Sequence, residues 1–175
     1  MSNPQARRLH ESIKKHAGPV AADAFTTAHP LTKSPSRKAA HEWAAAICRD
    51  LESSMDTALV QAIRRDCACG PAFGYKDEIR RIYRTSKGRP DFVRRFNEAE
   101  FGPVLQLDGE GFLFEYTQCY CSFVKHVESA LPASWCACTL GYAETLFSYV
   151  LDHKVSAVLL ESIKTGGNRC IIRIA

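Results

Sequence analysis

Three pairs of cysteines in the chain have a single residue between their two thiols: Cys67/Cys69, Cys119/Cys121 and Cys136/Cys138. Random placement of eight cysteines in 175 residues would seldom produce three such pairs. Side chains at positions i and i+2 of a strand point to the same face, so a pair on an extended segment presents both sulfurs to one side. Four thiolates that converge in this way satisfy the tetrahedral preference of Zn²⁺.

The paired cysteines are therefore the predicted metal ligands. Zinc is favoured over an iron–sulfur cluster, because the familiar cluster spacings differ from these. Cys67 and Cys69 either join the site of the other two pairs or form a second site with Cys170, and His41 and His126 are reserve ligands. Reversible disulfide chemistry and simple burial of the thiols stay open as alternatives. Cys48 lies on the same predicted helix as Trp43 and is expected to pack as an inert core residue.

Three side chains are candidates for acid–base or nucleophilic chemistry. Glu115 and Glu161 each interrupt an otherwise apolar predicted strand, where a carboxylate is either a general base or part of a solvent-facing edge. Cys138 directly precedes a predicted helix that begins near Thr139, and a helix N-terminus lowers the pKa of a thiol. Cys138 is therefore the candidate nucleophile.

The elements that must position these residues begin with helices. Residues 1–36 are predicted to be a leader with a short helix, because proline and glycine recur along them. In residues 37–66 an apolar residue recurs every four positions, which predicts helix. Ser36 is the expected N-cap, and residues 52–56 are expected to divide the pattern into two helices, with Asp56 capping the second.

The rest of the chain alternates between helical and strand patterns. Further helices are predicted over residues 76–88, 91–101 and 139–152. Strand patterns around glycine turns predict one hairpin over residues 104–116 and another over residues 154–175. This order predicts an α+β fold with an antiparallel sheet, in a single domain over residues 37–175.

The composition argues against several classes of protein. A hydrophobic fraction of 46% and a charged fraction of 24% are those of an ordinary globular domain. The first residues lack the apolar region of a secretory signal, and no stretch of about 18 apolar residues could span a membrane. Cysteines without an export signal are expected to be reduced, so we predict a cytoplasmic protein.

The charge distribution does not favour nucleic acid as a partner. A net charge of +4 is too small to indicate it. Basic residues do gather in residues 79–95, which include Arg80, Arg81 and Arg84. Such a stretch is typical of a solvated helix face, with binding of nucleic acid or an acidic ligand as the alternative.

The last third of the chain combines the paired cysteines, a TLGY segment opening a helix, and a closing hairpin that carries Glu161, Gly166/Gly167 and Cys170. In this order it resembles the C-terminal half of the 4-vinyl-reductase-type small-molecule-binding domain and the related amino-thiazoline-carboxylate-hydrolase-like proteins. It departs from that pattern at Ser162, where a first Cys is usual, and at Ile172, where an aromatic residue is usual. The resemblance implies a fold shared with transport-particle (TRAPP) subunits, with N-terminal helices packed on the sheet, an apolar ligand pocket and often a homodimer.

We therefore predict a cysteine-rich, zinc-binding protein that binds or senses a small apolar or aromatic molecule. Its apolar pocket would be lined by Phe112, Phe114, Tyr116, Tyr142 and Phe147. A zinc ion saturated by four thiolates has no open position, which favours binding over catalysis. The first alternative is a hydrolase acting on a small cyclic thio- or amino-acid, and the second is a nucleic-acid-binding regulator.

Overall fold

The computed structural model describes residues 3–69 and 74–175. The chain divides into two compact units that alternate along the sequence. Unit 1 consists of Met1–Ala68 and Tyr120–Cys138, and unit 2 of Cys69–Cys119 and Thr139–Ala175. Each unit has a hydrophobic core of its own.

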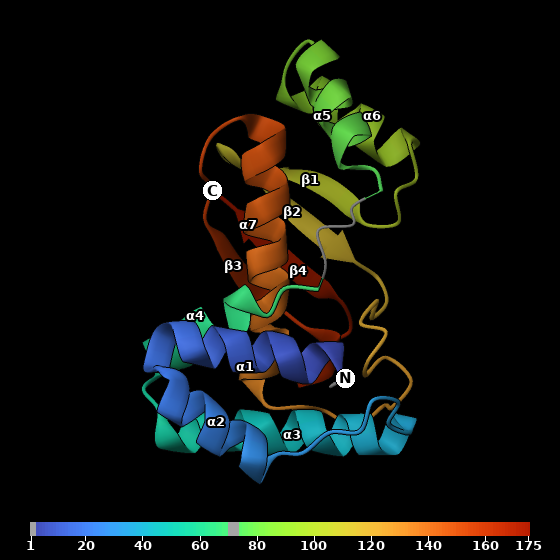
Figure 1. The fold of residues 1–175 in the computed structure, drawn as a ribbon. Coiled ribbons are helices and arrows are strands. Elements are labelled where there is room, and N and C mark those ends of the chain that lie inside the picture. The colour runs from blue at the N-terminus through green and yellow to red at the C-terminus, as the bar shows by residue number, and fades with distance from the viewer. Residues whose placement is uncertain (1–2, 70–73) are drawn as a thin grey trace. The chain divides into compact units, whose positions relative to one another are not determined.

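Unit 1 is built from helices, which are blue to teal in Figure 1 apart from η1. They are α1 (Pro4–Ala17), α2 (Pro19–Ala28), α3 (Arg37–Ser54), α4 (Thr57–Asp66) and the 3₁₀ helix η1 (Ala133–Ala137). Their apolar faces meet around Ile47, Leu51, Ile63 and Trp135, all of which are fully buried. This core holds the candidate site described below.

The division between α3 and α4 follows from two side-chain caps. The Ser36 hydroxyl accepts a hydrogen bond from the backbone N–H of Ala39 (3.2 Å), and the Asp56 carboxylate accepts one from Leu59 (2.9 Å). Such caps satisfy backbone donors that the first helical turn leaves without partners. Both predicted caps, and the predicted break between the two helices, are confirmed.

The segment predicted as a leader contains two helices that contribute to the core of unit 1. Leu9 and Ile13 are buried on one face of α1, and Ala22 is buried on α2. Gly18 separates the two helices with a φ of 89°, a conformation that glycine adopts without steric cost. Proline and glycine therefore divide this segment into two helices instead of leaving one short one.

Unit 2 packs helices on an antiparallel sheet. The helices are α5 (Lys76–Thr85), α6 (Arg89–Glu98) and α7 (Cys138–Leu151), whose first residue belongs to unit 1. The strands β1 (Val104–Asp108), β2 (Gly111–Tyr116), β3 (Ala157–Glu161) and β4 (Cys170–Ile174) lie in the order β1-β2-β4-β3. Helix α7 lies along the sheet, as Figure 1 shows. The predicted α+β class, with helices packed on an antiparallel sheet, is confirmed.

Both predicted hairpins are present, and they join in the middle of the sheet. In the first, Asp108 pairs with Gly111 across a turn in which Gly109 has a φ of 58°. In the second, β3 and β4 are connected by the 3₁₀ helix η2 (Ile163–Thr165) and the two glycines that follow it. The central strands β2 and β4 pair antiparallel, with Phe114 opposite Ile172.

An aromatic cluster fills the core of unit 2. Phe147 of α7 stacks on Phe112 with 6.2 Å between ring centroids, and contacts Phe114 edge-on at 5.2 Å. Phe92 and Phe96 of α6 extend the cluster through edge-to-face contacts with the same strand. In the part of the chain that the structure describes, no helix is both long and apolar enough to span a membrane.

Candidate functional site

The cysteines are divided between the two units. Unit 1 contains Cys48, Cys67, Cys121, Cys136 and Cys138, and unit 2 contains Cys69, Cys119 and Cys170. All eight lie within the described residues, and none forms a disulfide. Four of the predicted ligands thus occur in unit 1 and two in unit 2: Cys67, Cys121, Cys136 and Cys138 against Cys69 and Cys119.

The expectation that the Cys-x-Cys pairs lie on extended segments is wrong. Strand β2 ends at Tyr116, so Cys119 and Cys121 follow it in irregular structure. Cys136 lies within η1, and Cys138 is the first residue of α7. Side chains at i and i+2 share a face only in a strand, so the spacing does not by itself direct both sulfurs of a pair to one point.

A buried arginine, Arg64, lies near four of the five cysteines of unit 1. It belongs to α4 and is only 2% exposed. Its Nη2 donates a hydrogen bond to the carbonyl oxygen of Trp135 (2.8 Å), and its Nε donates one to that of Ser134 (3.4 Å). The guanidinium also lies over the Trp135 ring, with Cζ 4.5 Å from the ring centroid. Helix α4 and η1 are thereby joined through one cationic side chain.

Two cysteines share this hydrogen-bonding framework. The Sγ of Cys138 donates to the same Trp135 carbonyl that accepts from Arg64, at 3.5 Å. Cys67 follows α4 directly, three residues beyond Arg64, and its Sγ donates to the carbonyl oxygen of Ile63 at 3.3 Å. Residues three apart on a helix face the same side, which places the Cys67 thiol beside the guanidinium.

Helix α3 contributes a further cysteine to this group of residues. Cys48 is fully buried, next to the Ser134 side chain. Glu52, one helical turn further along α3, accepts a hydrogen bond from the backbone N–H of Ser134 (3.1 Å). The α3 helix and η1 are thus held together at the level of Cys48, and Cys136 follows Trp135 in the chain. We call Arg64 with Cys48, Cys67, Cys136 and Cys138 the arginine–cysteine cluster.

The electrostatics of the cluster are unusual because no carboxylate of the described residues lies within ion-pair distance of Arg64. Burial alone would lower the pKa of Arg64, but charge on the thiols of Cys67, Cys138, Cys48 and Cys136 raises that pKa above its ordinary value. Burial raises the pKa of the Cys48 and Cys67 thiols, and Arg64 offsets part of that rise. The positive charge of Arg64 and the negative charge of the thiolates therefore stabilise each other. The buried site disfavours either charge by itself.

One polar group of the cluster has no partner. The Ser134 hydroxyl oxygen is buried, and no hydrogen-bond partner for it occurs among residues 3–69 and 74–175. An unpaired buried hydroxyl costs free energy, so this oxygen destabilises the cluster as it stands. As the side chains stand, no three Cys, His, Asp or Glu residues of the described chain are placed to hold one metal ion.

Comparison with known proteins identifies the family. The model of a family of unknown function, DUF6144, matches residues 2–175. The chain belongs to this family. No curated protein matches the sequence. The DUF6144 match does not test the resemblance of the last third to 4-vinyl-reductase-type domains, which stays a prediction.

Two solved structures of H-NOX proteins from Shewanella oneidensis are similar to this DUF6144 chain. The NMR structure of an H-NOX domain in the Fe(II)CO ligation state has 14% identity and a TM-score of 0.47, over 99% of this chain and 97% of that one. A crystal structure of an H-NOX protein in the Fe(II)NO ligation state has 14% identity and a TM-score of 0.46, over 100% and 98% of the two chains. A likeness of this size says nothing about what this chain binds.

The two predicted catalytic carboxylates of unit 2 are engaged by one arginine. Glu115 is buried and forms an ion pair with Arg169 (3.0 Å). Glu161 accepts hydrogen bonds from the backbone N–H groups of Asn168 (2.7 Å) and Arg169 (3.3 Å). Both carboxylates thus bind residues of the turn before β4. A catalytic role for either one stays a prediction.

The five aromatic residues predicted to line an apolar pocket lie together in unit 2. Phe112, Phe114 and Phe147 are buried core residues, and Tyr116 and Tyr142 pack against that core. Burial raises the pKa of Tyr142 to about 12, although a hydrogen bond with Tyr116 works against the rise. Phe112 also lines a pocket of about 80 Å³ beside the end of β4. The residues are close to one another, and a ligand between them stays a prediction.

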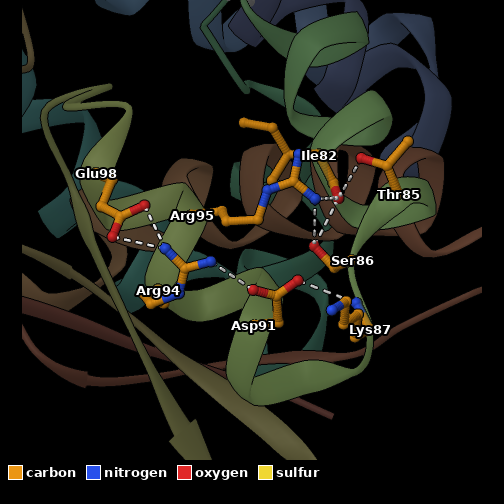
Figure 2. A network of polar contacts seen from close by, with 8 residues as sticks. All are labelled: Ile82, Thr85, Ser86, Lys87, Asp91, Arg94, Arg95 and Glu98. Atoms are coloured by element: carbon orange, nitrogen blue, oxygen red, sulfur yellow. Dashed lines mark hydrogen bonds and ion pairs between the residues drawn. The ribbon is translucent and has the colours of Figure 1, made fainter.

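Most arginines of residues 79–95 form ion pairs with carboxylates of their own unit. Arg80 and Arg84 both pair with Asp152, Arg81 pairs with Glu78, and Arg89 pairs with Glu110. Figure 2 shows Arg94 between Asp91 and Glu98, and Arg95 reaching Ile82 and Ser86. These pairs offset much of the positive charge that would attract a nucleic acid.

One of these carboxylates predicts a pH dependence. The backbone N–H of Lys87 and the Arg94 guanidinium lower the pKa of Asp91. A lowered folded-state pKa stabilises the fold above the unfolded value of about 3.9, and this stabilisation is lost as pH falls through the folded pKa. Asp91→Asn, whose amide oxygen can still accept from Lys87, should therefore lower the Tm at pH 7. Thermal unfolding from pH 7 to pH 2 should show the two Tm profiles converging, and a constant gap would contradict this assignment.

One member of the cluster, Arg64, was not considered from the sequence. Cys48 was expected to pack in the core, and its full burial in the core of unit 1 confirms this. A signal for Arg64 is nevertheless present, because Val60, Ile63, Arg64 and Cys67 occupy positions i, i+3, i+4 and i+7 of one helix face. An arginine within such an apolar stripe must be buried with a partner or reach to the surface.

Proposed function

We propose that this protein binds one zinc ion through the thiolates of the arginine–cysteine cluster, and that it works as a binding or sensor protein. The observation that carries the proposal is Arg64: it is a buried cation with four thiols around it and no carboxylate partner. A buried charge without a counter-charge is costly, and deprotonation of neighbouring thiols would supply one.

The charge balance favours a thiolate-bound metal. Zinc with four thiolates carries a net charge of −2, and a neighbouring guanidinium offsets half of it in a buried site. Thiol pKa values that burial raises oppose ionisation of the empty cluster, so the metal must displace the protons. Binding also requires the four side chains to turn toward one point, since no three of them are placed to hold an ion as they stand.

The proposed ligand set argues against metal catalysis. A zinc ion with four protein thiolates keeps no position for water or substrate, in contrast to catalytic sites with three protein ligands. The site is therefore assigned a structural or sensing role, in which metal binding stabilises unit 1. Among the predicted ligands, this set retains Cys67, Cys136 and Cys138, and it adds Cys48.

The test is elemental analysis of protein purified without a metal-affinity tag, with a count of free thiols under denaturing conditions. We expect about one zinc per chain. Cys67→Ser and Cys138→Ser should lose the zinc during dialysis against a weak chelator, while the matched control Cys69→Ser, at an exposed cysteine of unit 2, should keep it. A strong chelator should lower the Tm of the wild type, because zinc stabilises the state that binds it.

Three outcomes would refute the proposal. The first is metal-free protein with eight free thiols, and the second is thiols that are missing in pairs, which would indicate disulfide chemistry. The third is equal loss of zinc from Cys69→Ser and Cys67→Ser. Iron in place of zinc would keep the cluster as the metal site but change its identity to an iron–sulfur cluster.

A further inference from the structure

A second site in unit 1 is a pocket of about 310 Å³ between α1 and the end of α4. Its lining consists of Arg7, Arg8, Glu11, Ser12, Lys15 and Asp66. The first five recur at the spacing of one helix face, so α1 provides most of the wall. The volume equals that of about ten water molecules in the liquid, which leaves room for a small organic ligand and not only for an inorganic ion.

The charges of the pocket favour an anion. Lys15 Nζ and His16 Nε2 both approach Oδ2 of Asp66, at 2.6 Å and 2.8 Å, so this carboxylate is already neutralised. The exposed Glu11 lies against His10, with 3.3 Å between Oε1 and Nδ1. The pocket lining as a whole therefore carries one positive charge in excess, because three of its side chains are cationic and two are carboxylates.

Arg7 is free to bind a ligand. Its guanidinium is exposed and has no hydrogen-bond or ion-pair partner in the described part of the chain. Guanidinium groups bind carboxylate and phosphate through two parallel hydrogen bonds, which gives such pairs both strength and a fixed orientation. An oxyanion in the pocket would give Arg7 the partner that the protein does not provide.

One residue of the pocket lining is buried and polar. Ser12 is buried, and its hydroxyl donates to the carbonyl oxygen of Ile63 at 2.7 Å. The Cys67 thiol donates to the same carbonyl at 3.3 Å. Ser12 of the pocket lining and Cys67 of the arginine–cysteine cluster therefore share one backbone acceptor.

We propose that this pocket binds a small organic molecule through one oxyanion group, a phosphate or a carboxylate, held by Arg7 and Arg8 with Lys15 at the rim. The binding does not depend on the proposed zinc site, because none of the proposed zinc ligands lines the pocket. A ligand with a single charged group matches the charge excess, and its uncharged part would occupy the remaining volume.

The test is isothermal titration calorimetry of the metal-free full chain with glycerol 3-phosphate at constant ionic strength. Glyceric acid serves as the carboxylate probe, and glycerol serves as the uncharged control. We expect saturable binding of at least one of the two anions and none of glycerol. Arg7→Gln should weaken that binding about tenfold or more, because it removes a charge-assisted hydrogen-bonding group.

Two further variants keep the test specific. Arg8→Lys retains the charge but loses the fork of donors, so it should also weaken binding. Arg49→Gln removes an exposed arginine of α3 that does not line the pocket, and it should leave the affinity unchanged. Equal losses in Arg7→Gln and Arg49→Gln, binding of glycerol, or no saturable binding of either anion would overturn the proposal. Circular dichroism of each variant confirms that it is folded.

Discussion

Arg64→Ala is expected to lower the free energy of unfolding of unit 1 by about 3 kcal/mol or more. The substitution leaves the Ser134 carbonyl oxygen without its side-chain donor and the Trp135 carbonyl oxygen with only the weak Cys138 thiol donor, and an unpaired buried polar group costs about 1–3 kcal/mol. It also opens a cavity and removes the contact with the Trp135 ring. Removal of a buried cation works in the opposite direction, but the lost hydrogen bonds and packing outweigh it.

A second variant separates charge from volume. Arg64→Met keeps most of the side-chain volume, so it should cost less than Arg64→Ala while removing the same two guanidinium hydrogen bonds. Both tryptophans, Trp43 and Trp135, belong to unit 1, so urea unfolding followed by tryptophan fluorescence reports on this unit alone. Arg49→Ala, on an exposed side chain, should change the stability by less than about 0.5 kcal/mol. An effect of Arg64→Ala as small as this would show that Arg64 does not organise the cluster.

Phe147→Ala is expected to destabilise unit 2 by about 3–5 kcal/mol, the usual cost of removing a buried phenylalanine ring. Phe147 is fully buried and contacts Phe112 and Phe114 on the facing strand. Its loss therefore leaves a cavity between α7 and the sheet that neither rigid element can close. Urea unfolding followed by far-UV circular dichroism measures the change.

Two control variants on α7 test whether the loss of ring packing causes this effect. Phe147→Leu keeps part of the packing and should cost clearly less than the alanine variant. Thr145→Ala changes an exposed side chain of the same helix and should stay within about 0.5 kcal/mol of the wild type. If all three variants had similar stabilities, the aromatic cluster would not be the main source of stability in unit 2.

The elements that could be predicted from the sequence are those that local interactions determine. Ser36 and Asp56 each cap a helix within three residues of their own position, so their effect is visible in a short window. The hairpins are equally local, because a glycine turn and its flanking strands are contiguous. The pairing of β2 with β4 joins residues that lie far apart in the sequence, and no local pattern encodes it.

The candidate site shows the same division. The spacing of the cysteines drew attention to Cys67, Cys136 and Cys138, but the geometry inferred from that spacing was wrong because those residues do not lie on strands. Cys48 and Arg64 join them only through the packing of α3, α4 and η1 in unit 1. A buried cation among thiols is a property of three packed elements, and a single helix pattern shows only that the arginine is out of place.

The interleaving of the two units has a consequence for the order of events during translation. Unit 1 has all of its residues once Cys138 has been synthesised, whereas unit 2 still lacks β4, which pairs between β2 and β3. At about 5–20 residues per second, a ribosome needs roughly 2–7 s to reach the end of β4 from there. During this interval the hairpin of β1 and β2 exposes an unpaired edge on β2. A nascent chain with this unpaired edge is the form in which we expect chaperones to recognise this protein.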